Sequence, residues 1–107
     1  MLSFNDWKKA ELKIAKIVSA EAIEGKDKLY KIKILLGEEE RQIVAGIKPF
    51  YSEEELKGLN IVVVSNLEPA TIAGIKSEAM LLAAKAKDGS YKLVTIDEAV
   101  EAGTEVE

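Results

Sequence analysis

The chain of 107 residues contains no cysteine and no histidine. Without cysteine it can form no disulfide, and it offers no thiolate as a nucleophile or metal ligand. Without histidine it lacks the usual general base near neutral pH and the side chain that most often binds metals. Carboxylates and lysines remain, but no pair of them has a recognisable catalytic spacing. We therefore predict a protein that is not an enzyme and that uses no cofactor or metal ion.

Long apolar segments are missing too. No run of apolar residues approaches the ~20 that span a bilayer, and the segment 1–6 lacks the basic and apolar regions of a signal peptide. These absences predict a cytoplasmic protein without a membrane segment. The length suits one domain over residues 1–107, large enough to bury a single core.

The net charge of -4 is distributed unevenly along the chain. Residues 1–33 hold eight lysines and five acidic residues, which gives this third a charge of +3. Residues 34–56 have a charge of -4, and residues 57–107 have a charge of -3. Because salt screens charges beyond about 8 Å, a phosphate-binding surface requires locally clustered cations and not overall basicity. The N-terminal third is therefore compatible with nucleic-acid binding.

Apolar residues in alternation predict β-strands in the first half of the chain. A first strand over residues 12–18 loses its alternation between Ala15 and Lys16, as a β-bulge would cause. In the second strand, Lys31 and Lys33 share one face, and the other face is apolar, with Tyr30, Ile32, Ile34 and Leu36. Residues 37–40 are typical of a turn, and a third strand over residues 41–45 follows it.

Residues 52–58 predict a short helix between the third and fourth strands. Ser52 at the N-cap and Glu55 three residues later form a capping box, and Gly58 suits the C-cap. The glutamates at 53–55 are better explained by this capping than by a metal site, because adjacent helical residues point in different directions.

The remaining strands complete a recognisable order of elements. Residues 61–64 are all apolar, so both faces of this fourth strand should be covered, within a closed barrel or partly by a partner chain. Residues 80–84 and 91–96 flank the turn 88–90 and predict a terminal hairpin. The order indicates an all-β OB-fold, a five-stranded Greek-key barrel with a short helix between strands 3 and 4 and additional terminal strands.

Four segments, in order, resemble the tRNA-binding domain family typified by the C-terminal domain of methionyl-tRNA synthetase. They are Asp6–Val18, Asp27–Tyr30, Arg41–Ile47 and Asn66–Leu82. The resemblance implies an OB-fold that binds tRNA without catalysis and supports a methionyl-tRNA synthetase. It also implies a homodimer when the domain stands alone, and we expect this chain to be the free-standing, β-subunit-like form. Such a dimer would cover the outer face of residues 61–64.

The chain departs from the family's pattern in the last of these segments. Ala70, Thr71 and Ala73 occupy positions where such domains usually carry basic residues. If two or three phosphate contacts are thereby lost, affinity at cellular salt falls by about one or two orders of magnitude. We therefore expect weaker tRNA binding than in typical members, or binding that has moved to the N-terminal lysines.

The candidate RNA-binding residues are basic or polar side chains in or near these segments: Lys13, Lys16, Lys28, Lys31, Lys33, Arg41, Asn66, Lys76 and Ser77. Lys31 and Lys33 either follow a phosphate backbone or only keep the surface soluble. Arg41 either clamps a phosphate or pairs with one of the glutamates at 38–40.

Three residues of the last segment also have two explanations each. Asn66 either meets a base edge or, as we favour, holds the turn at Pro69 through its amide. Ser77 either binds a phosphate or caps a nearby backbone group. We expect Met80 in the core rather than at a contact.

Six aromatic residues are too few for extensive stacking on unpaired bases. We therefore predict recognition of structured RNA by its shape and backbone. Two other functions remain as alternatives to tRNA binding. The first is a peptide-binding dimer, because the family that this chain resembles also contains small secretion chaperones with the same dimeric fold. The second is a structural partner that docks onto a synthetase and has lost RNA binding. An exposed apolar patch without a continuous basic stripe would favour these alternatives. A continuous stripe of basic residues would favour tRNA binding, formed by Lys13, Lys16, Lys28, Lys31 and Lys33.

Overall fold

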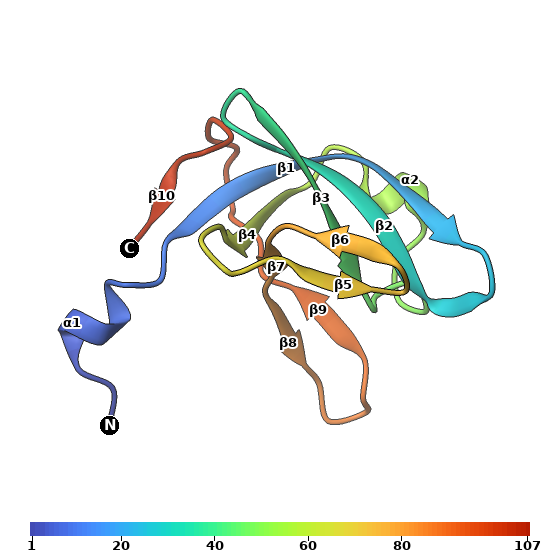
Figure 1. The fold of residues 1–107 in the computed structure, drawn as a ribbon, viewed down its shortest axis with the longest axis horizontal. Helices are drawn as coiled ribbons and strands as arrows, with labels where there is room; N and C mark the ends of the chain where they lie inside the picture. Colours follow the sequence, from blue (N-terminus) through green and yellow to red (C-terminus); the bar gives the residue numbers. More distant parts are fainter.

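The computed structural model describes residues 1–107, and β-strands dominate it (Figure 1). The long strands come first: β1 (Leu12–Ile23), β2 (Lys26–Leu36) and β3 (Glu39–Ala45). After α2 (Glu53–Leu56) and β4 (Asn60–Val64) follow six short strands, β5 (Ala70–Ile72), β6 (Ile75–Ser77), β7 (Met80–Leu81), β8 (Ala83–Lys85), β9 (Tyr91–Leu93) and β10 (Glu105–Val106). One turn of helix, α1 (Phe4–Trp7), precedes β1. No helix has the length and apolar sequence needed to span a membrane.

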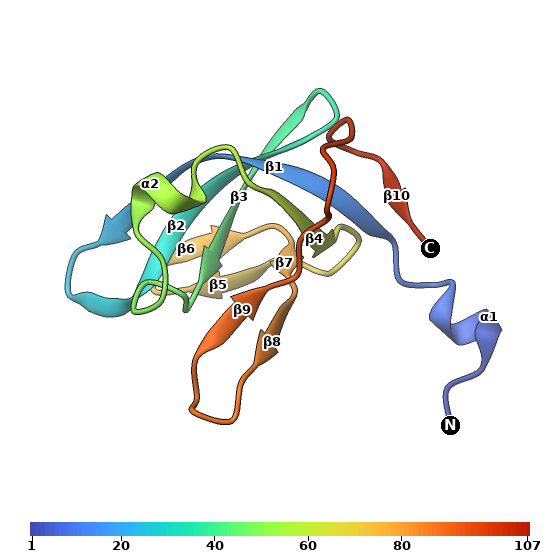
Figure 2. The same ribbon diagram turned by 180° about the vertical axis from the view of Figure 1, so that it is seen from behind.

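The main sheet closes into an OB-like barrel. Its strands lie in the order β3-β2-β1-β4-β7, and each neighbouring pair is antiparallel. At the closing seam, the Glu78 amide donates to the Gln42 carbonyl oxygen at 3.0 Å, which joins β3 to the segment before β7. The prediction of an all-β, OB-type fold is confirmed, although the chain is divided into ten strand segments (Figures 1 and 2).

Strand β2 follows the predicted alternation closely. Its four predicted apolar residues, Tyr30, Ile32, Ile34 and Leu36, are all buried in the main core. Lys31 and Lys33 therefore project from the opposite, outer face of the sheet. Burying an aliphatic side chain of this size contributes about 1.5–3 kcal/mol, so the alternation fixes which face of β2 meets solvent.

The bulge in β1 lies later than predicted. Ile14 and Ala15 are both buried because they face opposite sides of the strand, Ala15 in the main core and Ile14 in a second apolar cluster. The pairing of β1 with β2 shifts register between Ile17 and Ser19. The consecutive apolar residues thus indicate a strand segment covered on both faces, and the bulge follows it.

Strand β4 is also covered on both faces, and its own chain covers them. Ile61 and Val63 lie in the main core, whereas Val62 is buried in the second cluster with Leu12 and Ile14. The C-terminal segment packs on this cluster, and β10, which the sequence did not predict, pairs with β1 there. Since Val62 is buried without a partner chain, the expectation that a dimer covers this face is wrong.

Helix α2 has the predicted capping box. The Ser52 hydroxyl accepts from the Glu55 amide at 3.1 Å, and the Glu55 carboxylate accepts from the Ser52 amide at 2.9 Å. Gly58 follows with a φ of +88°, a conformation that favours glycine after a helix. The capping holds Leu56, which is fully buried, in the main core.

Two predicted turns are present in shorter form. The turn between β2 and β3 occupies only Gly37 and Glu38, because β3 begins at Glu39. The terminal hairpin pairs β8 with β9 around the turn at residues 88–90, while residues 80–81 pair with β4 instead. Helix α1 was not predicted, and it lies apart from the barrel in both views (Figures 1 and 2).

Candidate nucleic-acid interface

The outer face of β2 and β3 and the β5–β6 hairpin form a continuous surface. OB-folds bind ligands on the face of their second and third strands and in the loops after the first and fourth strands. Here β6 lies along β3, where Gln42 Nε2 donates to the Lys76 carbonyl oxygen at 3.0 Å. Gln42 also lies opposite Lys33 in the strand register. The sequence prediction missed Gln42, although its alternation with Ile43 would have placed it on the outer face.

Lys31 and Lys33 project from this outer face, as predicted. Lys31 Nζ lies 3.1 Å from a carboxylate oxygen of Glu21, and Lys33 Nζ lies 4.0 Å from one of Glu40. The Lys31 side chain is 31% exposed and that of Lys33 is 52% exposed. Exposed ion pairs contribute about 0.2–1 kcal/mol, so a phosphate can displace these glutamates at little cost.

Of the remaining N-terminal candidate lysines, only Lys16 shares this outer face. In β1, Lys16 is exposed and lies opposite Leu35 of β2, on the side of Lys33, whereas Lys13 is half-buried on the side of Ala15. Lys28 is exposed near the start of β2, and alternation places it on the side of Tyr30, opposite to Lys31. The five lysines are thus divided between faces, and they do not form the continuous stripe that would favour tRNA.

The β5–β6 hairpin presents the positions where basic residues are missing. Ala70, Thr71 and Ala73 are all exposed, and Lys76 is the only cation of the hairpin. At its tip, Ala73 and Gly74 have φ angles of 53° and 78°, as in the type I′ turns that connect two-residue hairpins. Basic side chains at the three neutral positions would therefore have reached solvent and any RNA bound there.

Ser77 and Asn66 form hydrogen bonds within the protein. Ser77 is buried, and its hydroxyl accepts from the Val44 amide at 3.0 Å and donates to the Ala79 carbonyl oxygen at 3.3 Å. Asn66 Oδ1 accepts from the Glu11 amide at 2.9 Å, and Nδ2 donates to the Lys9 carbonyl oxygen at 2.7 Å. Ser77 therefore matches the backbone-capping alternative. Asn66 fixes the segment before β1 instead of the turn at Pro69, so that explanation of Asn66 is wrong.

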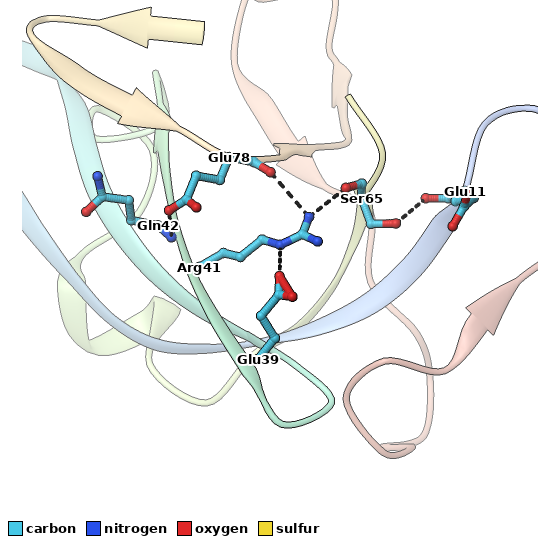
Figure 3. A network of polar contacts seen from close by, with 6 residues as sticks. All are labelled: Glu11, Glu39, Arg41, Gln42, Ser65 and Glu78. Carbon is cyan, nitrogen blue, oxygen red and sulfur yellow. Dashed lines mark hydrogen bonds and ion pairs between the residues drawn. The ribbon is translucent and has the colours of Figure 1, made fainter. Parts of the chain in front are cut away.

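Arg41 is enclosed by protein groups at one end of the barrel (Figure 3). Its Nε pairs with Glu39, and its Nη1 donates to the carbonyl oxygens of Ser65 at 2.6 Å and Glu78 at 3.3 Å. The side chain is 24% exposed. The ion pair with one of the glutamates at 38–40, one of the two alternatives, is thus present.

Next to the hairpin, an apolar groove of about 330 Å³ lies between the end of β3 and strands β7 to β9. Met80 is 56% exposed at this groove, so the expectation that it lies in the core is wrong; its neighbour Ala79 is buried instead. The lining residues are Val44, Ala45, Gly46, Ile47, Met80, Leu81, Ala83 and Tyr91. Such a groove is the kind of exposed apolar patch that a peptide-binding protein would use.

Comparison with known sequences identifies a family for most of this chain. A family model described as a putative tRNA binding domain matches residues 12–105. The methionine–tRNA ligase of Caldanaerobacter subterraneus subsp. tengcongensis is 46% identical over 105 residues, which are 98% of this chain and 16% of that protein. This chain thus spans only a small part of the length of its curated relatives.

Two solved structures share the fold over the whole chain. The MetRS-related protein from Pyrococcus horikoshii has a TM-score of 0.93 and 34% identity, with 100% of this chain and 98% of that chain covered. The chaperone CsaA from Bacillus anthracis has a TM-score of 0.91 and 30% identity, with 100% and 99% covered. The scaffold is common to a synthetase-related protein and a chaperone, so the fold by itself does not separate these functions.

Proposed function

Since this chain belongs to the family of putative tRNA-binding domains, we propose that it is a non-catalytic module that binds tRNA. The family resemblance predicted from four sequence segments is confirmed. The observation that carries the proposal is the family match over residues 12–105, which includes every candidate lysine.

The surface that we propose for tRNA is the outer face of β2 and β3 together with the β5–β6 hairpin. Lys31 and Lys33 supply positive charge on the sheet, and Lys76 supplies it on the hairpin. Lysines attract phosphates without reading sequence, so recognition rests on the backbone and shape of the RNA. With about three phosphate contacts, binding is weaker than in a domain whose hairpin is basic.

We also propose that the domain forms a homodimer and acts with a methionyl-tRNA synthetase in the cytoplasm. Helix α1 supports the dimer, because none of its residues is buried, and Phe4 and Trp7 are 71% and 41% exposed. Exposed large apolar side chains that cluster in this way mark contact surfaces. A dimer presents two tRNA-binding surfaces and so raises the effective concentration of the second site.

A second candidate function is the binding of extended peptides. The apolar groove beside Met80 favours it, as does the structural similarity to CsaA. The ligase relative is closer in sequence, however, at 46% identity against 30% for the chaperone. We therefore propose tRNA binding as the function and keep peptide binding as the second candidate.

Charge reversal on β2 tests the proposed surface. The double variant Lys31→Glu, Lys33→Glu should weaken tRNA binding at least about tenfold at low salt, because two contacts are lost and two repulsive charges are added. The matched control is Lys85→Glu, Lys87→Glu, which makes the same change in charge on exposed residues of the β8–β9 hairpin. Fluorescence anisotropy with labelled tRNA measures both affinities. Equal loss in the two variants would show that only the net charge matters, and an unchanged affinity of the β2 variant would exclude this face.

A further inference from the structure

Arg41 faces the inside of the barrel although it is charged. It lies opposite Ile34 in the register of β2 and β3, two residues before the buried Ile43. Alternation along β3 therefore places Arg41 on the core side, away from the outer face that carries Lys31 and Lys33. A charge in such a position requires partners within the protein.

The partners of Arg41 lie at the two ends of one chain segment (Figure 3). Ser65 directly precedes the segment 66–77 that contains the β5–β6 hairpin, and Glu78 directly follows it. A single nitrogen, Nη1, donates to the carbonyl oxygen of both residues, at 2.6 Å and 3.3 Å. The ion pair of Nε with Glu39 holds the guanidinium in the orientation that allows both bonds.

From these contacts we propose that Arg41 is a positioning residue that clamps the base of the β5–β6 hairpin and so fixes how the hairpin meets RNA. The inference rests on the proposed tRNA-binding function, but its structural part concerns only the hairpin. Arg41 acts through Ser65 and Glu78 and makes no contact with RNA. Hydrogen bonds from a charged donor are about twice as strong as neutral ones, so the clamp adds substantially to the neutral bonds by which Gln42 holds Lys76 and Glu78.

The tip of the hairpin provides an independent means of stabilising it. Ala73 has a φ of 53°, in the left-handed region that alanine adopts only with strain. Asn-Gly is the preferred pair for type I′ turns, so Ala73→Asn next to Gly74 should stabilise the hairpin without touching Arg41. Ala73→Asn can therefore restore the order of a hairpin that has lost its hydrogen bonds to Arg41. It cannot replace a lost contact between Arg41 and a phosphate.

The variants Arg41→Gln and Arg41→Lys test the clamp. Lysine keeps the charge, but it lacks the planar fork in which Nε faces Glu39 while Nη1 faces the two carbonyl groups, so it cannot reproduce this arrangement. In both variants, hydrogen exchange of the amides at residues 70–77 should accelerate by about tenfold or more, while exchange of Ile32 and Ile34 in the core stays unchanged. Unchanged hairpin exchange in Arg41→Gln would overturn the inference, whether or not the protein binds tRNA.

Affinity for tRNA separates positioning from direct contact. We expect about tenfold weaker binding in Arg41→Gln and nearly the same loss in Arg41→Lys, with part of it restored when Ala73→Asn is added. The single variant Ala73→Asn should change the wild-type affinity less than it changes that of Arg41→Gln. If Arg41→Lys kept full affinity and Ala73→Asn restored nothing, Arg41 would be a phosphate contact and the inference would fail. If the wild-type protein bound no tRNA, the proposed function would fail, while hydrogen exchange would still decide on the clamp.

Discussion

Among single residues, Tyr30 shows how buried polar groups hold the barrel together. Its hydroxyl donates to the Tyr51 carbonyl oxygen at 2.7 Å, and the Tyr51 hydroxyl accepts from the Leu93 amide at 3.0 Å. The two tyrosines thus connect β2 to β9 through the loop before α2. Burial, and then the nearby carboxylates of Glu53 and Glu55, raise the pKa of Tyr30 above its ordinary value of 10.0.

The raised pKa of Tyr30 predicts a specific loss of stability in alkali. Because the folded pKa exceeds the unfolded one, the contribution of Tyr30 is complete below pH 10.0 and is lost as the pH rises through the folded pKa. Tyr30→Phe should lower the free energy of unfolding by about 1 kcal/mol at neutral pH, through the lost hydrogen bond, and should reduce the alkaline loss. Urea unfolding across the pH range measures both effects. Parallel alkaline losses in the wild type and the variant would contradict this account.

Whether a residue's role could be predicted depended on how far away its partners lie in the sequence. The bond of Ser77 to Ala79 and the ion pair of Arg41 with Glu39 involve near neighbours, and backbone capping by Ser77 and an ion pair of Arg41 were both among the predicted alternatives. Asn66 bonds to Lys9 and Glu11, more than 50 residues away, which no local pattern could indicate. Met80 is exposed because its neighbour Ala79 takes the buried position in the strand alternation.

Among the elements, α2 shows how a four-residue helix is specified locally. Its capping box satisfies backbone amides at the first turn, and Leu56 anchors it in the core. Hydrogen bonds from the Ser52 amide, and then its hydroxyl, lower the pKa of Glu55. That contribution is present above the unfolded pKa of Glu55 and is lost as the pH falls through the lowered folded pKa.

Removing the cap should destabilise the whole domain, because α2 holds Leu56 in the main core. Ser52→Ala should lower the free energy of unfolding by about 1 kcal/mol, as typical for an N-cap. Ser52→Thr keeps a hydroxyl at the same position and serves as the matched control. Chemical denaturation compares the two. A loss as large with threonine as with alanine would show that the hydroxyl is not the stabilising group.

Strand patterns were predicted well where a strand has one solvent face and less well elsewhere. In β2 the alternation gave both the buried set and the outward lysines. In β1 the two consecutive buried residues resemble a bulge in the sequence, because the residues that cover the second face belong to the distant C-terminal segment. The short strands β5, β6 and β10 carry too few residues for a clear periodicity, and their pairing depends on the closed barrel.

For the whole molecule, the proposed dimer contact lies at α1, where Phe4 and Trp7 are exposed. Trp7 is the only tryptophan, so its fluorescence reports on α1 alone. If two copies associate through α1, dilution should shift the Trp7 emission to the red as the dimer dissociates. Light scattering should show a dimer for the wild type and a monomer for Phe4→Ser, while Val94→Ser, also at an exposed apolar residue, serves as the control. A dimer that persists in Phe4→Ser would place the interface elsewhere.

We propose above that this domain binds tRNA through phosphate contacts made by a few lysines. Titration of tRNA with the wild-type protein at several salt concentrations tests it most directly. With about three contacts, a plot of log affinity against log salt should have a slope of about -3, and Lys31→Glu, Lys33→Glu should make the slope shallower by about two. Binding that does not depend on salt, or no binding even at low salt, would contradict the account.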